Sequence, residues 1–281
     1  MRTWNPEPSI ASESGYTYLE DRRAAGPPCL GRRLVPYACS TALRFSLRFE
    51  RFFRMRLNLT LSPSTQPVPY DHLHRLTGAL HKWIGPDNDL HDGLSLYSFG
   101  WLDGGSGTRE GLTFADGARW RVSFYQPEAA KACLDGILRD PEVLCGMRVE
   151  EAKEQRVPSF SQAHTFKVDS PVLARVRRDD GSRAHLTWDD PEADAALTRT
   201  LRTKLQAAGV SDASPDAESN AVRVAFDRSY AHPKTKLARI KDTRHRANMC
   251  PVTVEGPPEA IRFAWLVGVG DLTGSGFGAL R

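Results

Sequence analysis

From residue 55 onward, the chain alternates between two hydrophobic periods. Residues 55–61 place an apolar side chain at every second position, as a strand with one buried face does. Residues 69–84 instead repeat leucine every three or four positions, which forms the apolar stripe of an amphipathic helix. The same criteria predict strands over 94–102, 119–125 and 143–157 and a helix over 127–138.

The second half of the chain repeats this succession of strands and helices more loosely. The pattern predicts a strand at 166–168, a hairpin over 173–188, a helix at 192–208, strands within 221–226 and 234–254, a helix at 258–267 and a last strand at 277–280. Strand, helix, strand, strand, helix, strand is the ferredoxin-like order. We therefore predict an α+β protein with two tandem ferredoxin-like (RRM-like, βαββαβ) domains, residues 55–160 and 161–281.

Residues 1–54 show no sustained period and combine prolines and glycines with scattered arginines. We interpret them as an extension that is poorly ordered or that results from a start codon assigned too far upstream. The alternative is a basic arm, in which Arg44, Arg48 and Arg51 share one helical face. The segment holds nine Lys or Arg and five Asp or Glu, so it accounts for the whole formal charge of +4.

The composition is that of an ordinary globular protein, with 40% hydrophobic and 26% charged residues among 281. The five cysteines include no Cys-x-x-Cys pair, which predicts reduced, buried thiols rather than disulfides or a cysteine-rich zinc site. No apolar run reaches the roughly 18 residues of a membrane-spanning helix or resembles a secretory signal. We therefore expect a cytoplasmic protein with no membrane partner.

Residues 222–250 form a basic stretch, where eight Lys or Arg oppose two Asp and the local charge is +6. In a strand-like alternation, Lys234 and Lys236 share one face of a ribbon, and so do Arg239 and Lys241. Backbone phosphates of an RNA are natural partners for such a ribbon. We predict RNA binding by Lys234, Lys236, Arg239, Lys241 and Arg244. The alternative is a charged face that is only solvated.

The C-terminus is unusually rich in glycine: Gly268, Gly270, Gly274, Gly276 and Gly278. No Lys-Ser or Lys-Thr follows, and the order is helix to strand, so neither a nucleotide P-loop nor a dinucleotide fingerprint fits. Glycines let backbone amides approach a ligand closely, and such amides can bind phosphates. We therefore predict that these glycines contact RNA. A flexible tail is the alternative, but Phe277 and Leu280 are typical core anchors.

The ending G-x-G-x-x-x-G-x-G-F-G, after a short apolar helix, resembles the CRISPR-associated endoribonucleases of the Cas6 family. Other pieces occur in the same order as in that family. They are Met55-Arg56-Leu57, Val68-Pro69-Tyr70-Asp71-His72, Leu90-His91-Asp92-Gly93 before Leu96-Tyr97-Ser98-Phe99, and Ser170-Pro171-Val172. The resemblance covers residues 55–281 and leaves 1–54 unmatched.

The resemblance implies a function for His91, which lies in the predicted loop before strand 94–102. A histidine at this place in the family acts in RNA cleavage that needs no metal or other cofactor. The 2′-hydroxyl attacks the adjacent phosphate, which gives a 2′,3′-cyclic phosphate and a 5′-hydroxyl. The partners implied are precursor and processed CRISPR repeat RNA, subunits of a CRISPR effector complex and a second copy in a homodimer. From the residues alone, His91 could equally be an exposed loop histidine.

His81 is the second catalytic candidate, on a face of the predicted helix 69–84 away from the apolar stripe. Some family members carry a tyrosine at this place and a lysine a few residues beyond the loop histidine. Here no lysine follows His91 closely, so the second catalytic group is left open. We expect His72 and His74 on the helix surface.

Other functions remain as alternatives. A metal-dependent His-Asp phosphohydrolase would need further His and Asp ligands, which are not evident around His91-Asp92. A non-catalytic RNA-binding subunit of the same fold would keep the product RNA for an effector complex. An unrelated α+β domain with a glycine-rich oligomerisation tail is the third possibility.

Overall fold

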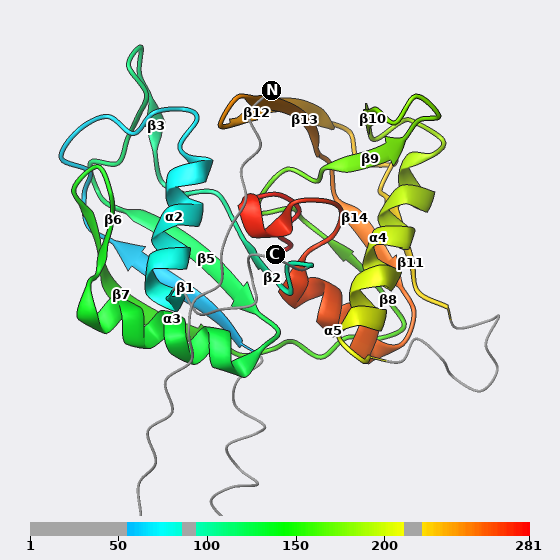
Figure 1. The fold of residues 1–281 in the computed structure, drawn as a ribbon, viewed down its shortest axis with the longest axis horizontal. Helices are drawn as coiled ribbons and strands as arrows, with labels where there is room; N and C mark the ends of the chain where they lie inside the picture. Colours follow the sequence, from blue (N-terminus) through cyan, green and yellow to red (C-terminus); the bar gives the residue numbers. More distant parts are fainter. Residues whose placement is uncertain (1–54, 86–93, 211–220) are drawn as a thin grey trace, which may run out of the picture. The chain divides into compact units, whose positions relative to one another are not determined.

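The structure is a computed structural model that describes residues 55–85, 94–210 and 221–281 (Figure 1). The predicted extension 1–54 and the predicted loop that holds His91 lie outside these residues. No helix in the described ranges is both long enough and apolar enough to span a membrane.

The first half forms a five-stranded antiparallel sheet in the order β2-β5-β1-β7-β6. Its elements are β1 (Met55–Leu61), α2 (Leu73–Ile84), β2 (Tyr97–Phe99), the small hairpin β3 (Ser106–Gly107) and β4 (Leu112–Thr113), β5 (Ala118–Phe124), α3 (Pro127–Arg139), β6 (Glu142–Leu144) and β7 (Met147–Gln155). Counted along the chain, the four main strands β1, β2, β5 and β7 lie in the order 4-1-3-2. This order and the two helices after the first and third strands make a ferredoxin-like domain.

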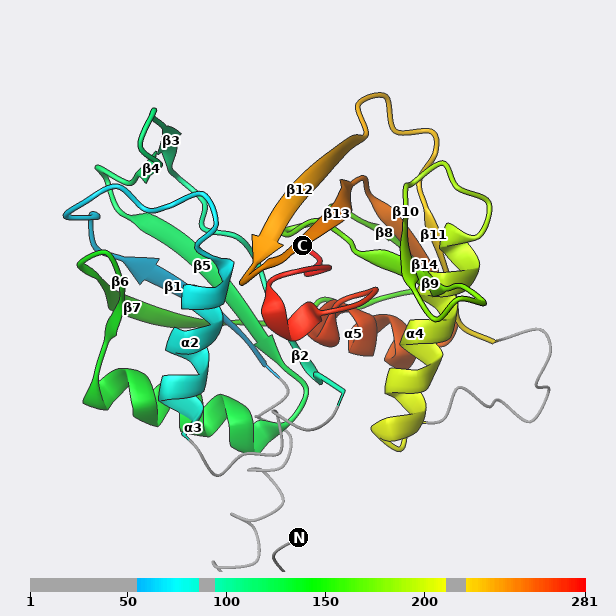
Figure 2. The same cartoon turned by 45° about the horizontal axis from the view of Figure 1, so that its top comes forward.

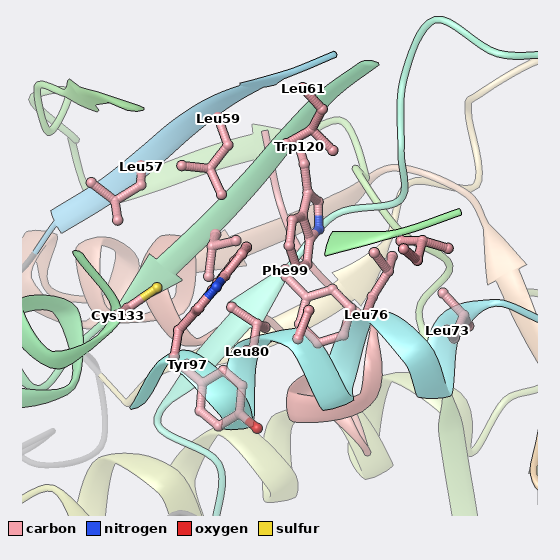
Figure 3. Close-up of a cluster of buried hydrophobic side chains, with 14 of the residues drawn as sticks. Leu57, Leu59, Leu61, Leu73, Leu76, Leu80, Tyr97, Phe99, Trp120 and Cys133 are labelled. Carbon is pink, nitrogen blue, oxygen red and sulfur yellow. The ribbon is translucent and has the colours of Figure 1, made fainter. Parts of the chain in front are cut away.

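The core of this half lies between the sheet and helices α2 and α3. The alternating leucines of β1 are buried as predicted, and the leucine stripe of α2 faces them (Figure 3). Trp120 of β5 fills the centre, with ring centroids 5.7 Å from Phe99 and 5.9 Å from Trp83. Burial of side chains of this size contributes about 1.5–3 kcal/mol each, which explains how the sheet holds α2 in place.

Two predicted strands differ in the structure. The strand predicted over 143–157 is a hairpin, because the chain turns at Cys145 and Gly146, whose φ angles are 50° and 76°. The strand predicted over 94–102 shortens to Tyr97–Phe99.

The second half forms a three-stranded sheet in the order β11-β14-β8. Its elements are β8 (Ala163–Phe166), the hairpin β9 (Ala174–Arg177) and β10 (Arg183–Leu186), α4 (Ala193–Ala207), β11 (Arg223–Phe226), the hairpin β12 (Lys234–Ile240) and β13 (Thr243–Met249), β14 (Val252–Glu255), α5 (Pro258–Val267) and the 3-10 helix η1 (Thr273–Ser275). The predicted last strand is reduced to a single bridge between Leu280 and Val168, beside β8. With that bridge as the fourth position, this half has the same 4-1-3-2 order.

Hydrogen bonds from buried polar side chains join the two halves. Arg56 of β1 is 2% exposed, donates from Nη2 to the carbonyl of Trp265 in α5 at 2.5 Å and lies with its guanidinium 3.7 Å from the ring centroid of Trp265. Ser98 Oγ donates to the Leu266 carbonyl at 2.8 Å. The two ferredoxin-like halves therefore share a bonded interface, and the predicted tandem fold is confirmed.

Candidate functional site

Three elements meet around the hydroxyl of Tyr97. The Tyr97 hydroxyl of β2 donates to the Gly274 carbonyl at 3.1 Å, and Nε2 of His81, in the last turn of α2, lies 3.1 Å from the same hydroxyl oxygen. Because the single hydroxyl proton goes to Gly274, the His81 ring bonds to the hydroxyl oxygen through Nε2–H. Burial raises the pKa of Tyr97 to about 12. The tyrosine therefore stays protonated and fixes the imidazole of His81 against residues 268–278, which we call the glycine segment.

Of the two catalytic candidates, only His81 is placed. His91 lies outside the described residues, so its distance from His81 stays open and its function stays a prediction. His81 is linked to the glycine segment by a hydrogen-bond chain through the Tyr97 hydroxyl to the Gly274 carbonyl.

The prediction that His72 lies on the helix surface is wrong, whereas His74 is exposed as expected. Helix α2 begins at Leu73, so His72 occupies the N-cap and is only 4% exposed. Its Nδ1 lies 2.8 Å from the Pro69 carbonyl, to which it donates. Its Nε2 is buried without a hydrogen-bond partner, and desolvation lowers the pKa of the ring. The neutral imidazole therefore presents Nε2 as an acceptor.

The glycine segment is packed into the fold. A β-carbon on Gly278 would lie 1.9 Å from the Val269 carbonyl oxygen, and one on Gly274 would lie 2.7 Å from the Tyr97 hydroxyl. The amides of Gly268 and Gly278 donate to the carbonyls of Ala264 and Pro171 at 2.8 Å. Close packing is thus sufficient to explain these glycines, and their contact with RNA stays a prediction.

Phe277 and Leu280 are buried, as predicted for core anchors. Phe277 belongs to the core of the first half and Leu280 to that of the second. The C-terminal segment is therefore not a flexible tail.

A buried lysine lies behind the glycine segment. Lys204 of α4 is 3% exposed and donates from Nζ to Thr273 Oγ1 at 2.8 Å. Desolvation lowers its pKa to about 7, although the nearby carboxylate of Asp271 acts in the opposite direction. We did not predict Lys204, yet it falls on the stripe that Leu197 and Leu201 mark along α4, so its helical position was a usable signal.

Replacing Lys204 by methionine should change how stability depends on pH. The unfolded lysine titrates near 10.5 and the folded one near 7, so the unfolded chain binds more protons between these values and the free energy of unfolding of the native protein rises across that window. Integrated over the window, the rise is on the order of 5 kcal/mol. The free energy of unfolding of Lys204→Met should lack this rise. The variant should therefore be most stabilised, relative to the native protein, below pH 7.

Urea unfolding at several pH values measures this difference. Lys131→Met, which removes a lysine whose side chain is 63% exposed, is the control and should parallel the native curve. A Lys204→Met curve that also parallels the native one would contradict a lowered pKa at Lys204.

The basic ribbon is the hairpin β12–β13, a two-stranded sheet of its own (Figure 2). Arg239 pairs with Arg244, and Leu237 pairs with Arg246, all on the face that is exposed. Lys236 lies on the other face with the buried Ala238 but is itself exposed. The predicted alternation is confirmed for Lys234 and Lys236, which share one face of β12. It is wrong for Arg239 and Lys241, because β12 ends at Ile240 and Lys241 adopts a φ of 51° in the turn. The five basic residues predicted to bind RNA are all exposed, with Lys241 at the turn.

One ion pair joins this ribbon to the start of α2. Arg239 donates to Asp71 Oδ2 from Nη2 at 2.6 Å and from Nε at 3.1 Å. The hydrogen bond from Arg239 lowers the pKa of Asp71. The pair gives the end of β12 a fixed place beside the residues before α2.

A second cluster that we did not predict borders the glycine segment. Nε2 of His185 lies 3.4 Å from Nδ1 of His245, and Arg175 forms an ion pair with Asp271 of the glycine segment at 3.2 Å. Burial, followed by the charge of Arg175, lowers the pKa of both histidines. Within the described ranges, no group of three or more His, Cys, Asp or Glu side chains is arranged to hold a metal ion.

Comparison with known proteins finds a family model and several solved structures. Residues 151–281 match the model of the C-terminal part of the CRISPR-associated protein Cas6. No curated protein matches the chain.

The solved structures cover most of this chain. A Cas6-related protein from Pyrococcus furiosus aligns with 18% identity and a TM-score of 0.70, over 81% of this chain and 97% of its own. A RAMP protein described as binding different RNA substrates aligns with 16% identity and a TM-score of 0.69, over 81% and 98%. A Cas6 product complex aligns with 16% identity and a TM-score of 0.57, over 81% and 99%. At these identities, the likeness establishes a shared fold.

Proposed function

We propose that this chain, whose residues 151–281 match the model of the C-terminal part of Cas6, is a Cas6-family endoribonuclease that cleaves CRISPR repeat RNA without a metal ion. The observation that carries the proposal is the junction of His81, Tyr97 and Gly274, where a fixed imidazole meets the glycine segment. A structural neighbour is described as a Cas6 product complex. His91 follows α2 in the sequence, ten residues after His81.

In the proposed reaction, a base takes the proton of a ribose 2′-hydroxyl, and the 2′-oxygen attacks the adjacent phosphorus. The bond from phosphorus to the 5′-oxygen breaks, and an acid donates a proton to that oxygen. The products are a 2′,3′-cyclic phosphate and a 5′-hydroxyl. His91 and His81 supply the two proton transfers, because imidazole titrates near neutral pH. Each such transfer contributes about 10²–10⁴ to the rate.

The exposed basic side chains of hairpin β12–β13 hold the RNA backbone in this proposal. They present several positive charges on one narrow ribbon, and Arg239 is positioned by Asp71. Phosphate contacts of this kind fix the RNA without reading its sequence. The partners proposed are the precursor and the processed repeat RNA, effector-complex subunits that receive the product and a second copy of the chain.

We expect purified protein to cleave repeat RNA at one position in EDTA. His91→Ala should slow cleavage by about 10²–10⁴ and leave RNA affinity unchanged, since general acid–base groups act on the transition state. His81→Ala should slow cleavage in the same range. His74→Ala removes an exposed histidine from the same helix and is the matched control. Denaturing gels and filter binding measure the two quantities.

RNA with a 2′-deoxy group at the scissile nucleotide should bind and remain intact. Cleavage of that RNA would contradict the proposed mechanism. Tight binding without cleavage of the natural RNA would identify a binding subunit instead, and the absence of both would refute the proposed function.

A further inference from the structure

A small pocket opens between the residues before α2 and strand β12. Its volume is about 140 Å³, well below the roughly 300–1,000 Å³ of sites that enclose whole small molecules. The lining side chains that matter here are Tyr70, Asp71, His72, Trp101, Leu237 and Arg239. A pocket of this size accepts one ring system of a larger ligand.

Two exposed apolar side chains mark the pocket. Tyr70 is 61% exposed and Leu237 is 64% exposed, although both are large enough to be core residues. The Tyr70 hydroxyl donates to the Thr108 carbonyl at 2.7 Å, which holds the ring in one orientation. Leu237 projects from the exposed face of the basic hairpin, paired with Arg246. A fixed aromatic side chain such as Tyr70 beside a basic ribbon is typical of the platforms on which nucleic-acid bases stack, and Leu237 adds an apolar contact next to it.

The positive charge beside the pocket complements the negatively charged phosphates that flank a base in RNA. Arg239 lines the pocket and pairs in register with Arg244, and both are exposed. The ion pair from Arg239 to Asp71 holds the two sides of the pocket together. A phosphate on either side of a stacked base would meet these guanidinium groups, which suit phosphate geometry.

A buried polar atom of the pocket residues is unsatisfied. His72 lines the pocket, and its Nε2 has no hydrogen-bond partner, although its Nδ1 is bonded to Pro69. A buried acceptor without a partner costs about 1–3 kcal/mol, and a donor group on a ligand would recover this. The exocyclic amines of adenine, cytosine and guanine are such donors, whereas uracil has no exocyclic amine and offers only its ring N3–H.

We propose that this pocket binds one unpaired nucleobase of the RNA, stacked on Tyr70 and Leu237, with an exocyclic amine donating to His72 Nε2. The inference rests on the proposed function, because it assumes that RNA lies along hairpin β12–β13. It adds a base-reading subsite at the junction of the two halves, separate from the phosphodiester that is cut. The base it selects carries an amine.

The test combines protein and RNA changes. Tyr70→Ala and Leu237→Ala should each weaken binding of uncleavable 2′-deoxy repeat RNA by about 5–100-fold, the effect of losing one stacked base. Leu138→Ala, which removes an 84% exposed leucine on α3, is the matched control. Tyr70→Phe keeps the ring and should bind within a few-fold of the native protein. Thermal unfolding checks that each variant is folded.

A scan of the RNA with single abasic nucleotides locates the base. One position should weaken native binding by a similar factor and have no further effect in Tyr70→Ala. Uracil at that position should weaken binding too, since it offers no amine to His72.

If the variants bind like Leu138→Ala and no abasic position is coupled to Tyr70, the pocket proposal is wrong, while the proposed function stands on cleavage. If the native protein neither binds nor cuts the RNA, the proposed function itself is wrong. The two outcomes therefore distinguish failure of the pocket proposal from failure of the proposed function.

Discussion

Replacing Gly278 by alanine is expected to remove most of the stability of the protein. Gly278 has a φ of 64°, a conformation that costs a residue with a β-carbon about 1–2 kcal/mol. The new β-carbon would also lie 1.9 Å from the Val269 carbonyl oxygen, so backbone must move in the segment where both cores meet. We expect a loss of more than about 4 kcal/mol in the free energy of unfolding, which is exceptional for one substitution.

Gly209→Ala separates the two causes. Gly209 has the same φ of 64°, but a β-carbon there would meet nothing within 4 Å. This control should lose only the cost of the left-handed conformation, measured by urea unfolding beside Gly278→Ala. Equal losses in the two variants would show that close packing of the glycine segment contributes nothing.

Removing three charges from the basic hairpin is expected to have the largest effect on RNA affinity. Each phosphate contact releases about one counterion, so Lys236→Gln, Lys241→Gln and Arg244→Gln together should lower the slope of log K against log salt by about 2–3. Near 0.1 M salt, this amounts to a loss of about 10²-fold in affinity. Arg239 is left in place because it also lines the pocket beside Tyr70.

The matched control removes three positive charges elsewhere. Lys131, Arg139 and Lys153 belong to α3 and β7, and the two lysines form local ion pairs with Asp135 and Glu151. Their replacement by glutamine should change the slope little in the same salt titration. If both triple variants lose the same affinity, RNA binding reflects overall charge and not the hairpin.

The fold was largely predictable because most elements carry one clear period. Helix α5 has the predicted bounds, since proline suits its first turn and an apolar run follows. The apolar pattern of Val143, Leu144 and Met147 continues across the turn, so it predicts one strand where the structure has the hairpin β6–β7. Cys145 adopts a positive φ at this turn, which is uncommon for a residue other than glycine and could not be predicted from its identity.

The site was less predictable, because contacts between distant segments decide it. Sequence pattern placed His81 off the apolar stripe of α2, but not beside Tyr97 or Gly274. His72 was misplaced because the helix begins four residues later than predicted, so the helical period did not apply to it. The glycines are predicted to contact a ligand, whereas close neighbours in the fold already require their lack of a side chain. These neighbours are backbone atoms at Gly268, Gly270 and Gly278 and side chains at Gly274 and Gly276.

The bonds that join the two halves also constrain how fast the chain can fold. Arg56 meets the carbonyl of Trp265 across 209 positions, and Ser98 meets that of Leu266 across 168. Folding slows as contacts become more distant in sequence, because a long loop must close before they form. We expect each half to build its local hairpins and helices before the interface around Arg56 forms. Before that step the face of α5 would be exposed to solvent, where chaperones or aggregation can act on it.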